Sequence, residues 1–513
     1  MIELATASLS PPGVSLAAMV TPPAPDEVAN GPGRPLTRRR FLAGVAVSTA
    51  GLVACAADPR PTALALASAT GSATPGRSPR GTDAAGTDVV ATGTPAVTQS
   101  PTASTQATAG PTVAGGPGRI LYRDAALADG RSPDLRVGVS ILVTDGRITW
   151  IRPSDAEEDP GRRDGLEVVD ASGATVVPGM VDAHSHVTGP GGTNWIARFS
   201  DPPDRLLAYA EDNGRLLTGA GVRWARDVGA PRGVDPVDGR DRALSLGIRD
   251  RWEGRRDRPR VRAAGTWIFK EGTGLAGMVV EVGDADGLVA AALAQLDDGA
   301  DLVKIYLDGP DPAVSPWTVA EVRRLVEAVH ARGARLTAHS SRLDGARVGA
   351  EAGVDALEHG FELDGDTCRT MASRGVFLVS TLTVMRSWLT FARTTRTERF
   401  ASPEGRRTIE ERLERALASV RTAHRSGVAI AAGTDFGGGS PRANQLAWEV
   451  ESLVSAGLQP WEALGAATWR GGELLRESDA GVIREGGPAD FFLVHGDPLS
   501  DPAALWRVWR VAW

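Results

Sequence analysis

Eight short apolar runs recur between residues 175 and 435, and segments with helical periodicity separate them. This alternation is typical of βα units, in which helices connect parallel strands. Eight units predict an α/β fold, a (β/α)8 TIM-type barrel, whose functional groups lie at the carboxyl ends of the strands. The expected strands span 175–186, 222–228, 260–268, 302–307, 335–340, 355–359, 377–382 and 429–435.

One linking segment shows the helical pattern clearly. Ser315 can cap a helix, Pro316 suits a first turn, and Gly333 can end it. The apolar residues that share one face are Val319, Val322, Leu325, Val326 and Val329. A doubly wound open sheet is the competing fold. The chain has no Gly-x-Gly-x-x-Gly after the first strand, which counts against the nucleotide-binding form of that fold.

Strand-rich sequence flanks the repeats on both sides. Two β-rich runs, 139–144 and 147–151, are joined by Asp145-Gly146, which predicts a hairpin. Strand-like residues return near the end of the chain. The expected domains are a small β-sandwich made from residues 118–174 and 478–513, and a barrel made from residues 175–477.

The first part of the chain resembles export and anchoring elements. Arg38-Arg39-Arg40 precedes an apolar stretch that ends just before Cys55, as in a twin-arginine signal joined to a lipobox. The stretch has 11 residues, and a spanning helix needs roughly 20. We expect residues 1–54 to be a signal and Cys55 to carry a lipid on the extracytoplasmic face of the cell membrane. A basic tail beside a chance apolar stretch is the alternative.

Composition limits the remaining possibilities. Residues 55–117 consist mainly of Ala, Thr, Ser, Gly and Pro, which predicts a disordered tether. The formal net charge is −7, so no general cationic field favours a nucleic-acid partner. The two cysteines, Cys55 and Cys368, provide neither a disulfide framework nor a cysteine-built metal cluster. A bound metal would therefore need histidine and carboxylate ligands.

Potential metal ligands lie on five of the expected strands. His184 and His186 are two residues apart in the first strand, so their side chains face the same way. Four imidazoles and a carboxylate on one rim suit a divalent metal of the borderline-soft kind. The other candidates, in chain order, are Lys304 and Tyr306 in the fourth strand, His339 in the fifth, His359 in the sixth and Asp435 in the eighth.

A single histidine is more often structural than a ligand, but this joint placement favours a site. The remaining histidines are interpreted as structural, because His330 and His424 lie near helix ends and His495 lies in a terminal turn. Lysine occurs only at Lys270 and Lys304 in a chain that otherwise uses arginine. Lys304 is therefore a site candidate, with an ordinary barrel cation paired to a carboxylate as the alternative.

Five motifs contain these candidates. They are Val176-Val177-Pro178-Gly179-Met180-Val181-Asp182-Ala183-His184-Ser185-His186, Gly299-Ala300-Asp301-Leu302-Val303-Lys304-Ile305-Tyr306, Ala338-His339, Leu357-Glu358-His359-Gly360 and Ala432-Gly433-Thr434-Asp435. In this order they resemble the amidohydrolase superfamily, most closely its prolidase-like and imidazolonepropionase-like branch. The similarity covers about residues 119–513, including the β-sandwich made from both chain ends.

The resemblance implies a binuclear centre with two divalent metal ions, zinc being the expected metal. One ion would be held by His184, His186 and Asp435, and the second by His339 and His359. Lys304, carboxylated by CO2, would bridge both ions through its carbamate. The chemistry agrees, because two dications repel an ammonium group but attract a carbamate anion.

The function that the resemblance implies is hydrolysis of a C–N bond in an amide, peptide or cyclic amide. A metal-activated hydroxide would attack the carbonyl, and Asp435 would act as general base and then acid. Tyr306 either donates to the developing oxyanion or only packs in the barrel. Arg386 and Arg442 are candidates for binding a substrate carboxylate, although each is more readily interpreted as a surface charge.

Two rival functions stay open. A lactone or phosphotriester hydrolase would use the same metal site with a differently shaped pocket. A non-catalytic surface-binding lipoprotein is the other possibility, although all six ligand positions are filled. The chain also departs from the family pattern at residues 437–444, a Gly-rich stretch where relatives often carry a histidine. Substrate contacts in that loop are therefore not predicted.

Overall fold

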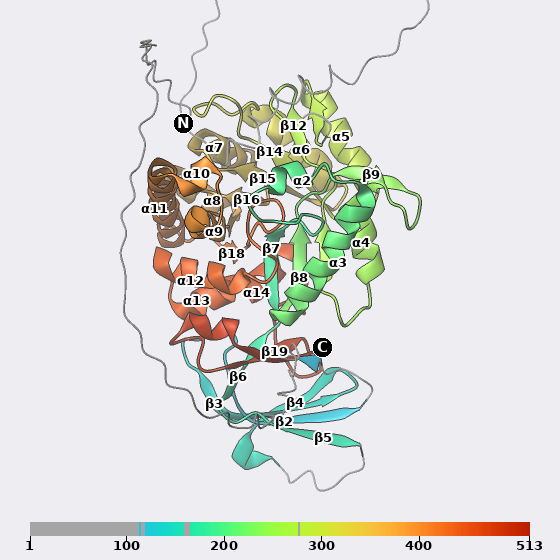
Figure 1. The fold of residues 1–513 in the computed structure, drawn as a ribbon, viewed down its shortest axis with the longest axis vertical. Helices are drawn as coiled ribbons and strands as arrows, with labels where there is room; N and C mark the ends of the chain where they lie inside the picture. The colour runs from blue at the N-terminus through green and yellow to red at the C-terminus, as the bar shows by residue number, and fades with distance from the viewer. Residues whose placement is uncertain (1–111, 114–117, 158–164, 275–277) are drawn as a thin grey trace, which may run out of the picture. The chain divides into compact units, whose positions relative to one another are not determined.

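The computed structural model describes residues 112–113, 118–157, 165–274 and 278–513 (Figure 1). The expected signal and nearly all of the expected tether lie outside these residues. Strand β1 (Thr112–Val113) falls within the expected tether and pairs with β20 (Val508–Ala512). Within the described ranges, no helix has both the length and the apolar character needed to span a bilayer.

An eight-stranded mixed sheet joins both ends of the described chain. The expected hairpin is present, because β3 and β4 pair antiparallel around Asp145-Gly146, where φ is 50° and 76°. The sheet extends past the expected boundary at residue 174, because β6 pairs with β19. Besides β1 and β20, its strands are β2 (Arg119–Leu127), β3 (Arg136–Thr144), β4 (Arg147–Pro153), β5 (Leu166–Asp170), β6 (Ala174–Pro178) and β19 (Phe491–His495).

Strand β19 lies between two apolar cores because its side chains alternate. Phe491 and Leu493 belong to the core of the terminal sheet. Phe492 and Val494 belong to the main core, which also contains the barrel-type strands and their helices. Burying each of these side chains contributes about 1.5–3 kcal/mol. One strand therefore links the packing of both regions.

Among the described residues, ten further strands are parallel and form one sheet of three strands and one of seven. Isolated parallel bridges join the two sheets at Ala264–Leu302 and at Ser185–Phe436. The three-stranded order is β11 (Arg260–Ala263), β8 (Val222–Asp227), β7 (Met180–Ser185). The seven-stranded order is β13 (Val280–Val282), β12 (Ile268–Lys270), β14 (Leu302–Tyr306), β15 (Arg335–Ser340), β16 (Ala356–His359), β17 (Phe377–Ser380), β18 (Ile430–Ala432).

Together with the intervening helices, these strands make an α/β fold of the TIM-barrel type (Figure 1). Each of the eight expected runs contains one of them. The expected strand 260–268 is wrong in extent, because β11 ends at Ala263 and β12 begins at Ile268. Gly265 lies in the break, where the side chain of Gln295 fills the space that a Cβ would need.

The N-cap of helix α6 (Val319–Ala331) differs from the expected one. Its N-cap is Thr318, which forms a capping box with Glu321, so Ser315 lies ahead of the helix. The apolar face was predicted well, because Val322, Leu325, Val326 and Val329 are buried. A reciprocal Thr–Glu cap satisfies two backbone donors and therefore outcompetes a lone serine.

The other helices connect and cover the strands. They are α2 (Trp195–Arg198), α3 (Pro203–Gly219), α4 (Leu244–Trp252), α5 (Ala285–Asp297), α7 (Leu343–Ala352), α8 (Gly365–Arg374), α9 (Thr383–Thr390), α10 (Glu398–Ala401), α11 (Pro403–Arg425), α12 (Leu446–Ala456), α13 (Pro460–Ala466) and α14 (Trp469–Leu475). A small hairpin, β9 (Arg232–Val234) with β10 (Asp241–Ala243), precedes α4.

Candidate metal centre

The carboxyl ends of four strands bring the predicted histidines and Asp435 together. The Nε2 atoms of His184 and His186 lie 3.4 and 3.3 Å from Asp435 Oδ1. His184, His359 and Asp435 each offer one ligand atom, and these atoms lie within 4.8 Å of one another. The ring of His339 is 4.5 Å from that of His359, centroid to centroid. All four imidazoles are buried.

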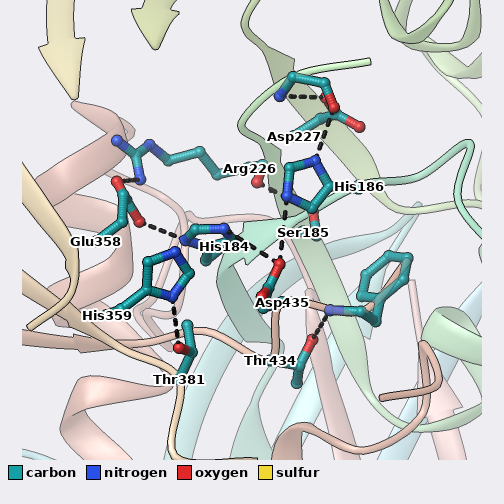
Figure 2. Close-up of polar contacts among 12 residues, drawn as sticks. His184, Ser185, His186, Arg226, Asp227, Glu358, His359, Thr381, Thr434 and Asp435 are labelled. Atoms are coloured by element: carbon teal, nitrogen blue, oxygen red, sulfur yellow. Dashed lines mark hydrogen bonds and ion pairs between the residues drawn. The ribbon is translucent and has the colours of Figure 1, made fainter. Parts of the chain in front are cut away.

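Outer partners orient three of the imidazoles (Figure 2). A histidine whose Nδ1 is engaged by a neighbour has a fixed ring orientation and leaves Nε2 for a metal. The three rings therefore turn their Nε2 edges toward a common region beside Asp435. The Nδ1 contacts are His184 to Glu358 Oε2 (2.6 Å), His186 to the Gly229 carbonyl oxygen (2.7 Å) and His359 to Thr381 Oγ1 (2.8 Å).

Backbone strain marks two of these positions. His359 and Asp435 have φ values of 72° and 55°, in the left-handed region that non-glycine residues avoid. This conformation costs roughly 1–2 kcal/mol per residue. Surrounding contacts hold Asp435 in place, because its backbone N–H donates to the His184 carbonyl oxygen at 2.8 Å. Such strain is retained mainly where the fold must aim a functional side chain.

Electrostatics set protonation states that suit metal binding. Burial, followed by the charge on Lys304, lowers the pKa of His184. Burial also holds the pKa of His359 well below its ordinary value. Burial opposes ionisation of Asp435, but interactions with His184 and His186 outweigh it and hold the pKa of Asp435 well below 3.8. Neutral imidazoles and an ionised carboxylate are the forms that bind divalent metals.

Lys304 and Tyr306 lie on β14 beside this group. Lys304 is 1% exposed, and its Nζ is 5.8 Å from the centroid of the Tyr306 ring. The Tyr306 ring is stacked between Phe269 and His339, with centroid distances of 3.8 and 4.2 Å. Tyr306 is therefore held by ring stacking, and it also lines the pocket described next.

A pocket opens onto the candidate ligands, and aromatic side chains form much of its wall. Among the described residues that line it, none is arginine or lysine. The wall therefore favours neutral, apolar groups near the ligands. Besides His184, His186, His339, His359 and Asp435, the lining residues are Trp195, Phe199, Trp267, Tyr306, Val384, Trp388, Gly438 and Gly439.

The two arginines considered for a substrate carboxylate point elsewhere. Arg386 donates to Ser455 Oγ at 2.7 Å, and the exposed Arg442 donates to the Pro190 carbonyl oxygen at 2.5 Å. Neither is among the described residues that line the pocket. Their interpretation as binding residues is not supported, and the Gly-rich stretch contributes backbone at Gly438 and Gly439 instead.

The three remaining histidines also lie away from the pocket. His330 Nε2 is 2.8 Å from Asp355, and His424 Nε2 is 3.2 Å from Glu462. The side chain of His330 is 42% exposed. The ring of His495 is 5.7 Å from that of Trp509. These contacts agree with their structural interpretation.

Buried carboxylates beside the candidate ligands were missed by the sequence reasoning, and one of them is Asp308, whose Oδ2 lies 3.4 Å from His339 Nε2. Glu358 holds His184 and also pairs with Arg226 at 2.8 Å. Asp182 accepts the Thr434 hydroxyl at 2.7 Å, and burial raises its pKa to about 7. Asp227 accepts two backbone N–H groups, and burial raises its pKa to about 6. The available signal was their position, because each lies next to or two residues from a candidate ligand or at a strand end.

Comparisons with known proteins agree with this arrangement. The model of the amidohydrolase family matches residues 175–511, and the chain belongs to that family. An imidazolonepropionase from Anaeromyxobacter dehalogenans is 26% identical over 424 residues, covering 73% of this chain and 89% of the relative. An uncharacterized protein of Mycobacterium tuberculosis is 28% identical over 382 residues, covering 73% and 90% respectively.

The fold is similar to that of a solved Xaa-Pro dipeptidase with bound methionine in its active site. The TM-score is 0.65 at 24% identity, over 76% of this chain and 97% of that one. The prolidase-like and imidazolonepropionase-like branch expected from the sequence is confirmed. The protein is a hydrolase that acts on C–N bonds.

Proposed function

We propose that the chain hydrolyses an amide, peptide or cyclic-amide bond with two divalent metal ions, zinc being the expected metal. His184, His186 and Asp435 would hold one ion, and His339 and His359 the other. One observation carries the proposal. Three imidazoles have their Nδ1 atoms engaged on the outside, so their Nε2 atoms lie toward one carboxylate that is ionised at neutral pH.

The proposal includes a CO2-derived carbamate on Lys304. The side chain is buried, and its ammonium charge lowers the pKa of His184 and of His359. Carboxylation would replace this cation with an anion that offers two oxygen atoms. Lysine alone among the side chains present can supply such a bridge at this position.

The residues divide the chemistry among them. A metal held by these residues would supply a water molecule that ionises near neutral pH. Asp435 accepts a proton from the attacking water and returns it to the leaving nitrogen. The Tyr306 hydroxyl donates to the carbonyl oxygen as negative charge develops there, while the stack with Phe269 and His339 holds its ring. The apolar wall excludes competing water.

The wall also suggests the kind of substrate. Trp195, Trp267 and Trp388 line the pocket without an accompanying arginine or lysine among the described lining residues. A substrate that is neutral and apolar next to its scissile bond fits this surface better than a free dipeptide does. Relatives of this chain bear names as different as imidazolonepropionase and ochratoxinase. We therefore infer the substrate class from the residues that line the pocket.

We further propose that eight of the ten parallel strands close into one barrel, with β12 and β13 as additions at its edge. The bridges Ala264–Leu302 and Ser185–Phe436 support this closure. The terminal sheet would curl into the β-sandwich, residues 1–54 would direct export, and a lipid on Cys55 would anchor the tether. Fractionation of cells that express the chain tests the anchor. The Cys55→Ser variant should leave the membrane fraction, and its retention there would refute anchoring.

The decisive test combines metal analysis with activity. Purified protein should retain two equivalents of metal and hydrolyse neutral aromatic amides or N-acyl amino acids in a panel that also includes lactones and phosphotriesters. A chelator should abolish hydrolysis, and added zinc should restore it. A preparation that never retains metal, or that hydrolyses equally well after complete metal removal, would refute the proposed function.

A further inference from the structure

A second pocket lies at the amino ends of β14 and β15, at the opposite end of these strands from the candidate metal centre. We call it the arginine pocket, because four of its lining residues are Arg226, Arg262, Arg335 and Arg476. Its volume is about 180 Å³. The other lining residues are Asp301, Leu302, Gly333, Leu474 and Leu475.

Three of the four guanidinium groups form ion pairs with carboxylates. Arg226 pairs with Glu358, Arg262 with Glu477, and Arg335 more distantly with Asp355 at 3.4 Å. Asp301 is the one carboxylate among the described lining residues, and it is engaged elsewhere, because it accepts hydrogen bonds from the Ala263 N–H at 2.8 Å and from Arg249 at 3.0 Å. No ion pair joins Arg476 to a carboxylate within the described ranges.

Arg335 is only partly compensated by the neighbouring carboxylate. Its Nε is buried without a hydrogen-bond acceptor among the residues that the structure describes. Burial, reinforced by repulsion from Arg476 and Arg226, outweighs Asp355 and lowers the pKa of Arg335. A buried N–H donor without an acceptor costs roughly 1–3 kcal/mol, which a bound acceptor would recover.

Arg476 occupies a backbone position where glycine is the usual residue. Helices α7, α8 and α12 end on Gly353, Gly375 and Gly457, all in the left-handed conformation. Helix α14 ends in the same conformation on Arg476, with φ of 58°. Glycine adopts this conformation without the steric cost that an arginine incurs. The arginine at this cap therefore indicates a use for its guanidinium group.

We propose that the arginine pocket binds a phosphate-class oxyanion, either inorganic phosphate or the phosphate group of a small monoester. Guanidinium groups match tetrahedral oxyanions through paired N–H donors, and such charge-assisted hydrogen bonds are about twice as strong as neutral ones. The guanidinium group of Arg476 and the Nε of Arg335 would donate to the oxyanion, because the neighbouring carboxylates that the structure describes do not engage them.

Arg226 joins this pocket to the candidate metal centre. The same side chain lines the pocket and donates to Glu358 Oε1 at 2.8 Å, and the other oxygen of Glu358 accepts from His184 (Figure 2). A bound oxyanion would share Arg226 with Glu358. The site therefore lies one side chain away from the partner of a predicted metal ligand.

Calorimetric titration of the metal-loaded protein with inorganic phosphate, at constant ionic strength in chloride, tests the proposal. We expect saturable binding that weakens about tenfold in Arg476→Gly, because one charge-assisted pair of hydrogen bonds is lost. Glycine suits the left-handed cap, so this variant should fold at least as stably as the parent. Arg425→Ala removes an exposed arginine outside the pocket and should bind phosphate like the parent.

Two outcomes would overturn the proposal. One is the absence of phosphate binding by the parent protein. The other is equal affinity of the parent and Arg476→Gly, which would place the ion elsewhere, including at the metals. If Arg476→Gly melts well below the parent, Arg335→Met replaces it and has to show the same loss. A parallel titration with glycerol phosphate distinguishes inorganic phosphate from a phosphate monoester as the ligand. A closed pocket binds only the free ion, whereas an open pocket also binds the ester.

Discussion

The two ends of the parallel strands carry different chemistry. At the carboxyl ends, buried histidines face an ionised Asp435, and outer partners fix three of the rings. At the amino ends of β14 and β15, four arginines from several elements line a cavity, and the buried Nε of Arg335 has no acceptor among the described residues. One end therefore presents metal-ligand side chains and the other presents guanidinium groups, and the contact of Arg226 with Glu358 links the two.

Replacing Asp435, the carboxylate among the candidate ligands, should have the largest effect, which is a loss of catalytic rate. Asp435→Asn keeps the shape but loses the proton acceptor, so kcat should fall by roughly 10²–10⁴. Asp366→Asn, on the exposed surface of α8, is the matched control and should retain full rate. Steady-state kinetics on an amide substrate measure both. Unchanged kcat in Asp435→Asn would remove this residue from the mechanism.

The contact between the two ends should have the next largest effect. Glu358→Gln leaves the buried Arg226 without its counter-charge, and the free energy of unfolding should fall by about 3 kcal/mol at pH 7. Arg226, Lys304 and His184 outweigh burial and hold the pKa of Glu358 well below 4.5. The stabilisation is therefore present above pH 4.5 and is lost as the pH falls through the folded-state pKa.

Urea denaturation of both proteins at several pH values measures this difference. The gap between parent and Glu358→Gln should shrink as the solution becomes more acidic. Glu362→Gln, which changes a partly exposed glutamate 3.4 Å from Arg342, should cost less than about 1 kcal/mol. An equal decrease in the free energy of unfolding in the two variants would show that the Arg226–Glu358 ion pair stabilises the fold no more than an exposed pair does.

A smaller effect concerns a carboxylate that supports the carboxyl end of β17. Glu449 accepts the Ser380 hydroxyl at 2.6 Å and the Thr383 N–H at 2.7 Å, yet burial raises its pKa above 4.5. Ionisation therefore opposes folding, so this contribution to stability falls as the pH rises above 4.5 toward the folded-state pKa. Glu449→Gln should flatten that part of the pH–stability curve. An unchanged slope in urea denaturation would contradict the assignment.

The smallest expected effect is at Cys368 on α8, away from both ends. Its side chain is fully buried, and burial raises its pKa to about 11. In a Cys55→Ser protein it is the single thiol, and it should react with a disulfide reagent at pH 8 only after unfolding. Rapid labelling of the native protein, followed by absorbance, would show that α8 opens readily.

Much of the fold and of the carboxyl-end site could be predicted, because both depend on local patterns. Strand periodicity, the pair His184 and His186, and potential ligands on five of the eight expected strands are visible in the sequence. The motifs also identified the family. The break between β11 and β12 was not predictable, because it depends on Gln295 of α5 filling space beside Gly265.

The outer contacts were harder to predict because they join distant segments. Glu358 and Arg226 are separated by 132 positions, and nothing local marks them as a pair. The arginine pocket combines side chains from β8, β11, β15 and the end of α14. In a chain with many arginines, only the assembled fold shows that these four line one pocket. Thr318 displaced Ser315 as a helix cap for a local reason, the reciprocal contact with Glu321.

The alternation of side chains in β19 has a consequence for biosynthesis. Phe492, Val494, Val511 and Trp513 complete a core whose earlier members include Val177. A nascent chain therefore cannot finish packing that core until Trp513 has emerged from the ribosome. A fragment ending before residue 491 would therefore expose apolar surface that is buried in the full chain and would depend on chaperones.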